Sequence, residues 1–521
     1  MKRNRILFGG LLIAIPMLFS VMGCNKFLDR KPLTATLDDI SQGTLEAQAF
    51  GLYNTLTAYA GFSTLPWLDF HSIRDDDAQK GSSLTDGAEI NTEFETFQYS
   101  KDDWAPNSYW NDHYYMINQA NKLLYFADSL HATDPASLRN VGEACFFRAY
   151  CYFELVKTYG DVPLINFYYT IPAQGVKPKS PASAIYAQID ADLTKAAQYL
   201  PVNWVVGGAN IYPGRLTKGA ANTLWAQSYL FRQQWANVVA LCTQVENAGQ
   251  YNLEANFPDI WKDGMGGAGK NGSESIWEEQ SYVGPNQTPW KGTQFGTSQN
   301  VRQGGASNVW NLGWGWNTPT SKLEAAWDNN DPRKRQTILY SGQSDGGPSQ
   351  GGYGATLPVY GPGSSLDQPY WNKKVYSDPQ MRQFTGQIYG SGGADWINHR
   401  ILRFADVILM HAEASNELAD GATAATYLEK IRNRASGNLG AGRSVVPPIA
   451  FVSQAQMRTA IKNERRWEFA MEGHRFYDLV RWGDAVTELG ALGYTHKCRF
   501  YPIPQKAIDL SGGVLTQNPE W

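Results

Sequence analysis

The stretch Asn463–Gly483 (NERRWEFAMEGHRFYDLVRWG) constrains the fold of this chain most, because it is dense in charges and in aromatic rings at once. Glu464, Glu468 and Glu472 recur every fourth residue, with arginines interleaved between them. At helical spacing, the bulky residues fall on one stripe before Gly473 and on a second stripe after it. The pattern predicts two short helices packed into a core with their charges paired. A catalytic site built from glutamate and arginine is the alternative.

Helical periodicity extends in pairs over much of the chain. Helices are expected over residues 43–59, 107–130, 135–159, 182–200, 218–231, 235–249, 400–418 and 421–435. The pairs 218–249 and 400–435 are each about 34 residues long and carry alanines at their packing positions, which resembles tetratricopeptide units. Because unlike insertions separate the pairs, the scaffold is expected to be an irregular stack and not a regular solenoid.

Two stretches, 61–106 and 252–398, do not follow the helical pattern. The first is predicted to be a long excursion outside the core. The second is rich in Gly, Ser, Asn, Gln and Trp, and short strands are expected at 275–280, 359–360 and 373–376. Long ordered loops on a rigid scaffold are usually functional, so these two stretches are the expected location of a site.

The N-terminus predicts export and lipidation. A basic start, Met1–Arg5, precedes the apolar stretch Ile6–Met22, which Gly and Pro interrupt, so residues 1–23 are predicted to be a secretory signal and not a membrane span. The Val-x-Gly-Cys sequence that follows predicts acylation of Cys24, which would give stable membrane anchoring through a tether over 24–42. A disulfide at Cys24 is the alternative.

The other cysteines are Cys145, Cys151, Cys242 and Cys498. Cys145 and Cys151 lie about 120° apart around one predicted helix, so both are expected to be buried thiols. Their spacing does not match a zinc site. A net charge of −4 and the lack of a basic block in the mature chain give no electrostatic footprint for nucleic acid. The 18 Trp, 28 Tyr and 22 Phe exceed what a core needs, so some rings are expected at the surface.

Motifs of one known family occur in order along nearly the whole mature chain. They are Cys24–Asp29, Arg148–Leu155, Tyr159–Pro163, Gly214–Arg215, Lys218–Ala220, Glu274–Trp277, Asp331–Arg333, Leu402–Asp406, Ala412–Ala414, Ile431–Arg434, Glu464–Trp482, Tyr501–Pro504 and Gln517–Pro519. On these motifs the chain resembles the SusD/RagB family of nutrient-binding outer-membrane lipoproteins.

The resemblance implies a mostly α fold of four tetratricopeptide-like hairpins, with a large loop-rich insertion that carries a few short strands. It implies one domain over 43–521, with the scaffold at 43–60, 107–251 and 399–521 and ligand-binding loops at 61–106 and 252–398. It also implies a cell-surface lipoprotein that binds an oligosaccharide, a peptide or another nutrient. Such a protein is a lid on a SusC-like TonB-dependent transporter; it is not an enzyme and needs no cofactor.

Sugars combine flat C–H faces with hydroxyl groups, which suits displayed aromatic rings beside polar side chains. The tryptophans Trp290, Trp310, Trp314 and Trp316 lie among Gly, Asn and Gln, and the glycines of 309–316 disfavour a buried helix or strand. We predict that at least two of these four tryptophans contact ligand; packing of the loop region against the scaffold is the alternative. Tyr370, Trp371 and Trp396 are further candidates; packing of these isolated rings into the core is the alternative.

The first excursion lies where the family commonly presents part of its ligand site, so Trp67, Arg74 and Asp76 are also predicted ligand contacts. Arg74 can donate to two hydroxyls or to a carboxylate, and Asp76 can accept from hydroxyls. The alternatives for Asp75–Asp77 are a solvated turn or Ca²⁺ ligation. Without the spaced oxygen ligands of an EF-hand, no metal is predicted.

Three other functions have weaker support in the sequence. The loop Gly264–Asn271 matches a loose phosphate-loop pattern, but Asn271 follows Lys270 where Ser or Thr is required, so an exposed loop is expected. A glycoside hydrolase would need two carboxylates that flank the sugar bond, whereas Glu278 and Glu279 are adjacent and would face opposite ways on a strand. A surface adhesin without a small ligand is the remaining alternative.

Overall fold

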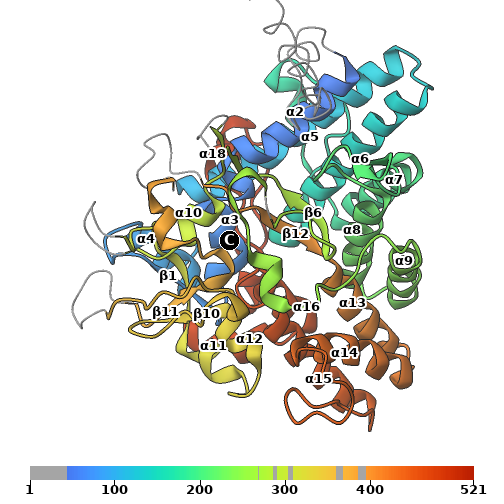
Figure 1. Ribbon diagram of the computed structural model, residues 1–521. Coiled ribbons are helices and arrows are strands. Elements are labelled where there is room, and N and C mark those ends of the chain that lie inside the picture. The colour runs from blue at the N-terminus through green and yellow to red at the C-terminus, as the bar shows by residue number, and fades with distance from the viewer. Residues whose placement is uncertain (1–43, 268, 285–289, 303–308, 360–367, 385–394) are drawn as a thin grey trace, which may run out of the picture.

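The paired helices that the periodicity predicts are present, and they form one side of the molecule (Figure 1). The computed structural model describes residues 44–521 except 268, 285–289, 303–308, 360–367 and 385–394. The scaffold helices are α2 (Leu45–Ala58), α5 (Trp104–Ser129), α6 (Pro135–Tyr159), α7 (Ala182–Tyr199), α8 (Lys218–Phe231), α9 (Trp235–Asn247), α13 (Phe404–Glu417) and α14 (Gly421–Ala435). Helix α6 packs against α5 and α7, and α13 packs against α9 and α14. The predicted mostly helical class is confirmed, at 53% helix and 9% strand.

Local sequence explains where these helices begin and end. The Asp134 side chain accepts from the N–H groups of Ala136 and Ser137 at the start of α6, both at 3.0 Å, and Pro135 occupies the first helical position. The helix ends at Gly160, whose φ of 76° an L-residue adopts only with strain. Because such signals are local, the ends of most scaffold helices are predicted to within a few residues of those observed.

The Asn463–Gly483 stretch forms α15 (Gln454–Glu468) and α16 (Arg475–Trp482), so the predicted pair of helices is confirmed. The chain turns between them at Gly473, with φ at 78°. A Cβ on Gly473 would lie 2.7 Å from the Trp67 ring, so only glycine fits this turn. Two more short helices follow, α17 (Ala485–Leu489) and α18 (Gln505–Leu510).

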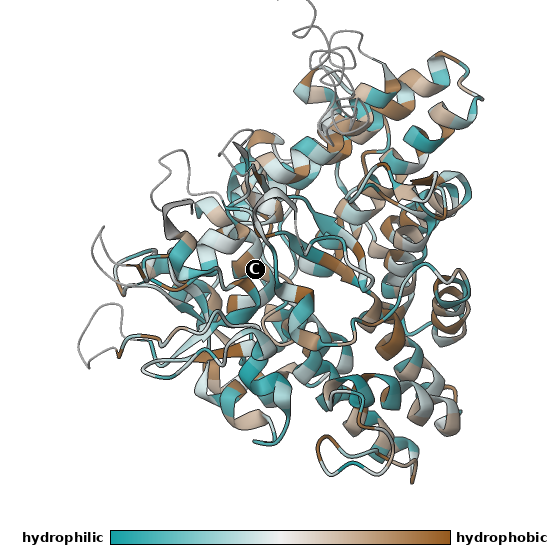
Figure 2. Ribbon diagram, in the orientation of Figure 1, coloured by the Kyte–Doolittle hydropathy of each residue, from teal (hydrophilic) through white to brown (hydrophobic). Residues whose placement is uncertain are grey.

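The charges of this stretch are paired inside the protein. Glu468 is 0% exposed and accepts hydrogen bonds from Arg333, Arg403 and Arg434. Arg465 donates to Asp406 at 2.7 Å and to Asp478 at 2.9 Å. In Figure 2, hydrophilic colour marks α12 (Pro332–Thr337) and α15, although Arg333, Glu464 and Glu468 on these helices are buried. The predicted ion-pair network is confirmed, and it joins α15 to the loop-rich side.

The strands of the described residues form antiparallel pairs. They are β1 (Ala78–Gly81) with β9 (Trp316–Pro319), β2 (Val162–Pro163) with β3 (Lys179–Ser180), β4 (Val205–Val206) with β5 (Ala209–Asn210), β6 (Ser275–Glu279) with β12 (His399–Arg403), β7 (Tyr282–Val283) with β8 (Trp290–Lys291), and β10 (Ile338–Tyr340) with β11 (Tyr370–Asn372). The strand predicted at 275–280 is confirmed.

Three local predictions are wrong. Residues 400–403 belong to β12 and not to the helix after it, because pairing with β6 holds them extended. Lys373–Val375 is a 3₁₀ turn where a strand was expected. Val359 lies outside a strand, and its predicted partner Tyr360 lies outside the described residues.

The 61–106 stretch is not outside the core, which corrects the prediction. It contains α3 (Leu65–Leu68), α4 (Ala88–Ile90) and two π-helical turns, and Phe62, Phe70 and Phe94 are each 0% exposed in the main core. These segments are too short and irregular to show a helical period in the sequence. Their rings are nevertheless buried, because other segments of the chain pack against them. The loop-rich side also holds α10 (Phe295–Gln299) and α11 (Ser321–Ala326).

Cys145 and Cys151 are buried free thiols, as predicted, and so are Cys242 and Cys498. Cys24 lies outside the described residues. Among the residues that the structure describes, no helix combines the length and apolar character needed to cross a membrane.

Candidate functional site

The segment from Trp310 to Trp316 is held rigidly on the loop-rich side. The N–H of Leu312 donates to Val301 O at 2.9 Å, and the N–H of Trp314 donates to Thr297 O at 2.8 Å. These bonds fasten the segment along α10 and the residues after it. The rings of Trp310 and Trp314 remain partly exposed, and each packs on one side against a hydrophobic cluster.

Trp371 and Trp316 form the base beneath this segment. Trp371 is 0% exposed and lies in the same cluster that Trp310 packs against. Trp316 is 5% exposed in β9, where the Lys80 Nζ lies 5.0 Å from its ring centroid. Gly315 has φ at 74°, and a Cβ there would lie 2.9 Å from the Trp371 ring, so glycine is required for this close approach.

Polar side chains surround the two partly exposed rings. Arg302 donates to Ser82 Oγ at 2.7 Å and to Trp314 O at 3.4 Å, and it pairs with Asp86. The hydrogen bond from Arg302 lowers the pKa of Asp86, so this carboxylate is an ionised acceptor at neutral pH. We call Trp310, Trp314, Arg302, Asp86 and the amides described next the tryptophan surface.

Two glutamines complete the tryptophan surface. The Gln79 side-chain N–H donates to Gln368 Oε1 at 3.1 Å, and Gln368 donates to Ser82 O at 3.4 Å. Thr318 in β9 donates to the same Gln368 oxygen at 3.3 Å. Aromatic faces, amides, a guanidinium and a carboxylate thus lie on the β1–β9 ribbon and the loop beside it. This is the set of groups that can stack on a sugar ring and bond its hydroxyls.

The structure places Trp67, Arg74 and Asp76 elsewhere, in the interior. Arg74 is 0% exposed; it donates to Phe70 O at 2.7 Å and to Tyr477 Oη at 2.9 Å. Trp67, 6% exposed, is stacked on His71 with ring centroids 4.5 Å apart. In this conformation neither side chain has a face available to a ligand.

Asp76 is 3% exposed and bonds Arg475 at 2.9 Å and Lys322 at 2.6 Å. Burial raises the pKa of Asp76, but the hydrogen bond and charge of Arg475, with further cations, lower it to about 2. The solvated turn considered for Asp75–Asp77 is therefore wrong, because all three carboxylates are buried. Asp76 and Asp77 pair with cations on α11, α15 and α16, and Asp75 accepts from the backbone N–H groups of Asp77 and Ala78. Among the described residues, no group of three His, Cys, Asp or Glu is arranged to hold a metal ion.

Of the predicted contacts, Trp310, Trp314, Trp316 and Trp371 come together, with the first two at the surface and the others beneath. The side chain of Trp290 lies outside the described part of the structure. Trp396 is 3% exposed and donates to Asp263 O at 3.0 Å, so it packs the interior. Ligand contact by these side chains stays a prediction.

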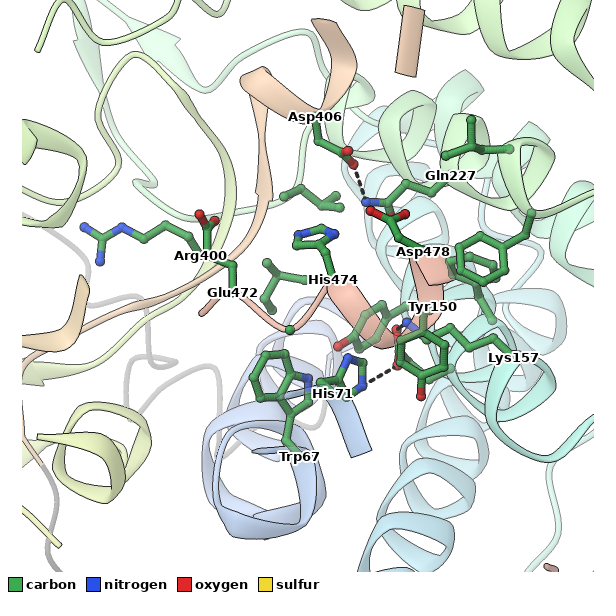
Figure 3. Close-up of a pocket in the computed structure, with 18 of the residues that line it drawn as sticks. Trp67, His71, Tyr150, Lys157, Gln227, Arg400, Asp406, Glu472, His474 and Asp478 are labelled. Atoms are coloured by element: carbon green, nitrogen blue, oxygen red, sulfur yellow. Dashed lines mark hydrogen bonds and ion pairs between the residues drawn. The ribbon is translucent and has the colours of Figure 1, made fainter. Parts of the chain in front are cut away.

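A polar cavity of about 70 Å³ lies where the scaffold meets the C-terminal helices (Figure 3). Trp67, His71 and His474 surround it in the close-up, and Gln227 donates to Asp406 at 2.8 Å beside it. Burial lowers the pKa of His71 to about 3, so its imidazole is neutral at pH 7. Because ligand pockets typically enclose about 300 Å³ or more, this cavity is too small for a sugar and belongs to the polar interior.

A second cavity, of about 220 Å³, is lined by Lys270 of the glycine-rich loop and by Glu254, Glu274 and Glu278. The Lys270 ammonium donates to Ser281 O, so this lysine is turned inward and bound by the protein itself. The strand β6 follows this loop where a phosphate loop requires a helix. Arg400 and Arg403 also line this cavity, and carboxylates pair with both: Asp263 with Arg400 and Glu274 with Arg403.

The Glu278–Glu279 pair does not form a hydrolytic site. Glu278 is 2% exposed and accepts from Asn398 at 2.7 Å, and Glu279 is 0% exposed beside His399. A retaining or inverting hydrolase needs both carboxylates open to one sugar bond. Burial raises the pKa of Glu279 to about 8, so this group is protonated at neutral pH.

Sequence reasoning missed a group of exposed rings on α5. Trp104 is 45%, Tyr115 41% and Tyr125 55% exposed. The helical period of this stretch predicts a scaffold helix, and the buried face of α5 confirms that prediction. The missed signal was aromatic residues at positions that the same period places on the polar face.

Comparison with known proteins identifies the relatives of the chain. The model described as "SusD family" matches residues 273–497, and the model described as "Starch-binding associating with outer membrane" matches residues 26–230. SusD-like protein P2 of Formosa agariphila is 25% identical, with 100% of each chain covered. A SusD-like protein of Bacteroides ovatus is 24% identical over 91% of this chain and 82% of its own.

Solved structures of SusD-like proteins share the fold of this chain. A laminarin binding SusD-like protein is 26% identical, with a TM-score of 0.72 over 92% of this chain and 99% of its own. Surface glycan-binding protein A from Bacteroides thetaiotaomicron, in complex with laminarihexaose, has a TM-score of 0.70 at 20% identity over 92% of this chain and 99% of its own. SusD-like proteins of this kind bind without catalysing a reaction. Fold, ordered motifs and matches along the whole length together show that the chain belongs to the SusD/RagB family.

Proposed function

We propose that the protein binds an oligosaccharide at the tryptophan surface and delivers it to a SusC-like TonB-dependent transporter. The observation that carries the proposal is the pair of partly exposed rings, Trp310 and Trp314, on a backbone clamped to Thr297 and Val301. A ring already fixed before binding loses little entropy when it stacks on a sugar.

The chemistry of the surrounding side chains supports a neutral, hydroxylated ligand. Arg302 and Asp86 offset each other's charge, and Gln79 and Gln368 supply both donors and acceptors. A sugar hydroxyl donates and accepts at once, so it fits such paired groups. A peptide carboxylate would instead favour a guanidinium without a carboxylate partner.

Laminarin is the first glycan to test. The solved relative named as a laminarin binding protein shares 26% identity with this chain, and a second similar fold was solved with laminarihexaose. We extend this ligand class to the present chain as part of the proposal.

The anchor is the second part of the proposal. Acylation of Cys24 would hold the protein at the outer membrane with its binding face to the cell exterior, and the matched family description names association with the outer membrane. Cys24→Ala is expected to move the protein to the soluble fraction. Retention of this variant in the membrane fraction would contradict lipid anchoring.

Titration calorimetry tests the binding site. Trp310→Ala and Trp314→Ala are expected to weaken laminarihexaose binding by about tenfold each, since loss of one stacking ring costs about 1–2 kcal/mol. The matched control is Trp235→Ala, a partly exposed tryptophan at the start of α9. Unchanged affinity in a variant that carries both Trp310→Ala and Trp314→Ala would refute this location of the site.

The transporter is tested by purification. The tagged protein is expected to co-purify with a TonB-dependent transporter from its own outer membrane after mild solubilisation. Isolation without such a partner, together with no glycan binding, would favour the alternative of a surface adhesin.

A further inference from the structure

The exposed side of α5 carries aromatic rings in two groups. Tyr115 is 41% exposed, and its ring centroid lies 4.8 Å from that of Tyr59. Phe126, 37% exposed, lies about 16 Å further along the axis and about 20° around it, so the two groups face the same way. We call these rings, with Tyr125 and Tyr168, the α5 aromatic face.

The second group is a cluster of three rings. The Tyr125 centroid lies 5.5 Å from that of Phe126 and 5.8 Å from that of Tyr168, and Phe126 and Tyr168 are 6.4 Å apart. Tyr125 is 55% exposed despite these contacts. These rings hold one another in place by mutual contact, yet they remain exposed to solvent and do not form part of the hydrophobic core.

The cluster is fixed to the scaffold. Asn118 donates to Tyr169 O at 3.2 Å and accepts from the Tyr169 N–H at 3.3 Å, which ties the segment that carries Tyr168 to α5. Because α5 is a long helix packed on α6 and α2, the rings are displayed on a rigid support. Such a support reduces the entropy lost on binding.

The residues between the two groups indicate the class of ligand. Between Tyr115 and Phe126, Lys122 is the one charged side chain, and Asn118 and Gln119 are partly exposed amides. A nucleic acid would need a basic stripe, and a membrane surface would need a continuous apolar face with several cations. In a protein–protein interface, the hot-spot rings cluster at one desolvated centre, whereas here polar amides separate the two groups of rings.

We propose that the α5 aromatic face is a second contact site for a neutral polysaccharide chain. This proposal rests on the proposed function, because it assumes that the ligand is a glycan. The face lies on the helical scaffold, away from the β1–β9 ribbon that carries the tryptophan surface (Figure 1). A long polysaccharide would engage both sites, and a short oligosaccharide would need only the tryptophan surface, so the second site would act through avidity.

Affinity electrophoresis in gels that contain laminarin tests the proposal, with starch and xylan gels run beside it. The variant is Tyr115→Ala with Tyr125→Ala and Phe126→Ala. The matched control is Phe451→Ala, an exposed ring (43%) between α14 and α15. The apparent affinity of the triple variant for the polysaccharide is expected to fall by about tenfold. Its affinity for laminarihexaose in calorimetry is expected to stay at the wild-type value.

The outcomes separate the two proposals. The melting temperature of the triple variant shows whether it is folded. If the folded variant is retarded in the laminarin gel as strongly as the wild type, the α5 site is overturned and the proposed function stays intact. A wild-type protein that no polysaccharide retards would overturn both. Loss of transporter co-purification in the triple variant, with polysaccharide retardation unchanged, would overturn the glycan assignment in favour of a protein interface.

Discussion

Replacing Glu468 by glutamine tests whether the buried ion-pair network holds the C-terminal helices to the loop-rich side. Burial acts to raise the pKa of Glu468, but Arg434, Arg403 and Arg333 together lower it from 4.5 to about 2. A drop of this size corresponds to about 3 kcal/mol of stabilisation of the folded state. Because Glu468→Gln also leaves three buried guanidiniums without their shared anion, we expect a loss of about 3–5 kcal/mol.

Urea unfolding at pH 7, followed by tryptophan fluorescence, measures this loss. The control is Glu417→Gln, because Glu417 pairs with Arg458 at 2.7 Å and the Arg458 side chain is 38% exposed. A pair so open to water contributes about 0–1 kcal/mol. Equal losses in the two variants would refute the argument that burial makes the network at Glu468 essential.

The pH dependence gives a second check on Glu468. Since the folded-state pKa is depressed, the contribution of this carboxylate is present above pH 4.5 and is lost as the pH falls towards 2. The unfolding free energy of the wild type is therefore expected to fall more steeply over this window than that of Glu468→Gln. Parallel curves for the two proteins would contradict the assignment.

Three further predictions concern the site, the interior and the thiols. Gly315→Ala places a Cβ 2.9 Å from the Trp371 ring at a φ of 74°, so it should cost about 1–3 kcal/mol in urea unfolding and weaken glycan binding; a neutral result would refute the close-packing argument. Burial raises the pKa of Glu279 to about 8, so wild-type stability should fall as the pH rises from 4.5 to 8, and Glu279→Gln should remove this fall in melting temperature; identical profiles would contradict it. Burial raises the pKa of Cys145 to about 12, so this thiol should resist an aromatic disulfide reagent until the protein is unfolded, and rapid labelling of the native protein would exclude the described packing.

The scaffold helices and the ion-pair network could be predicted from the sequence because their signals are local. The period of 3.6 residues, the Asp134 cap and the glutamates of 464–472 are all read within one or two turns. The error at residues 400–403 has the opposite origin, since β12 is extended by pairing with β6, more than a hundred residues earlier. A pattern read within one segment does not contain such a partner.

The sequence by itself determined the helical class, the family motifs and the abundance of rings beyond the needs of a core. Only the tertiary structure decided which rings reach the surface. Trp371 and Trp310 occur in similar loop sequences, yet one is 0% exposed and the other is partly exposed, because exposure depends on which distant segments cover each ring. Arg74 and Asp76 look like ligand-binding groups in the sequence, and the partners that α16 brings from some four hundred residues away make them internal.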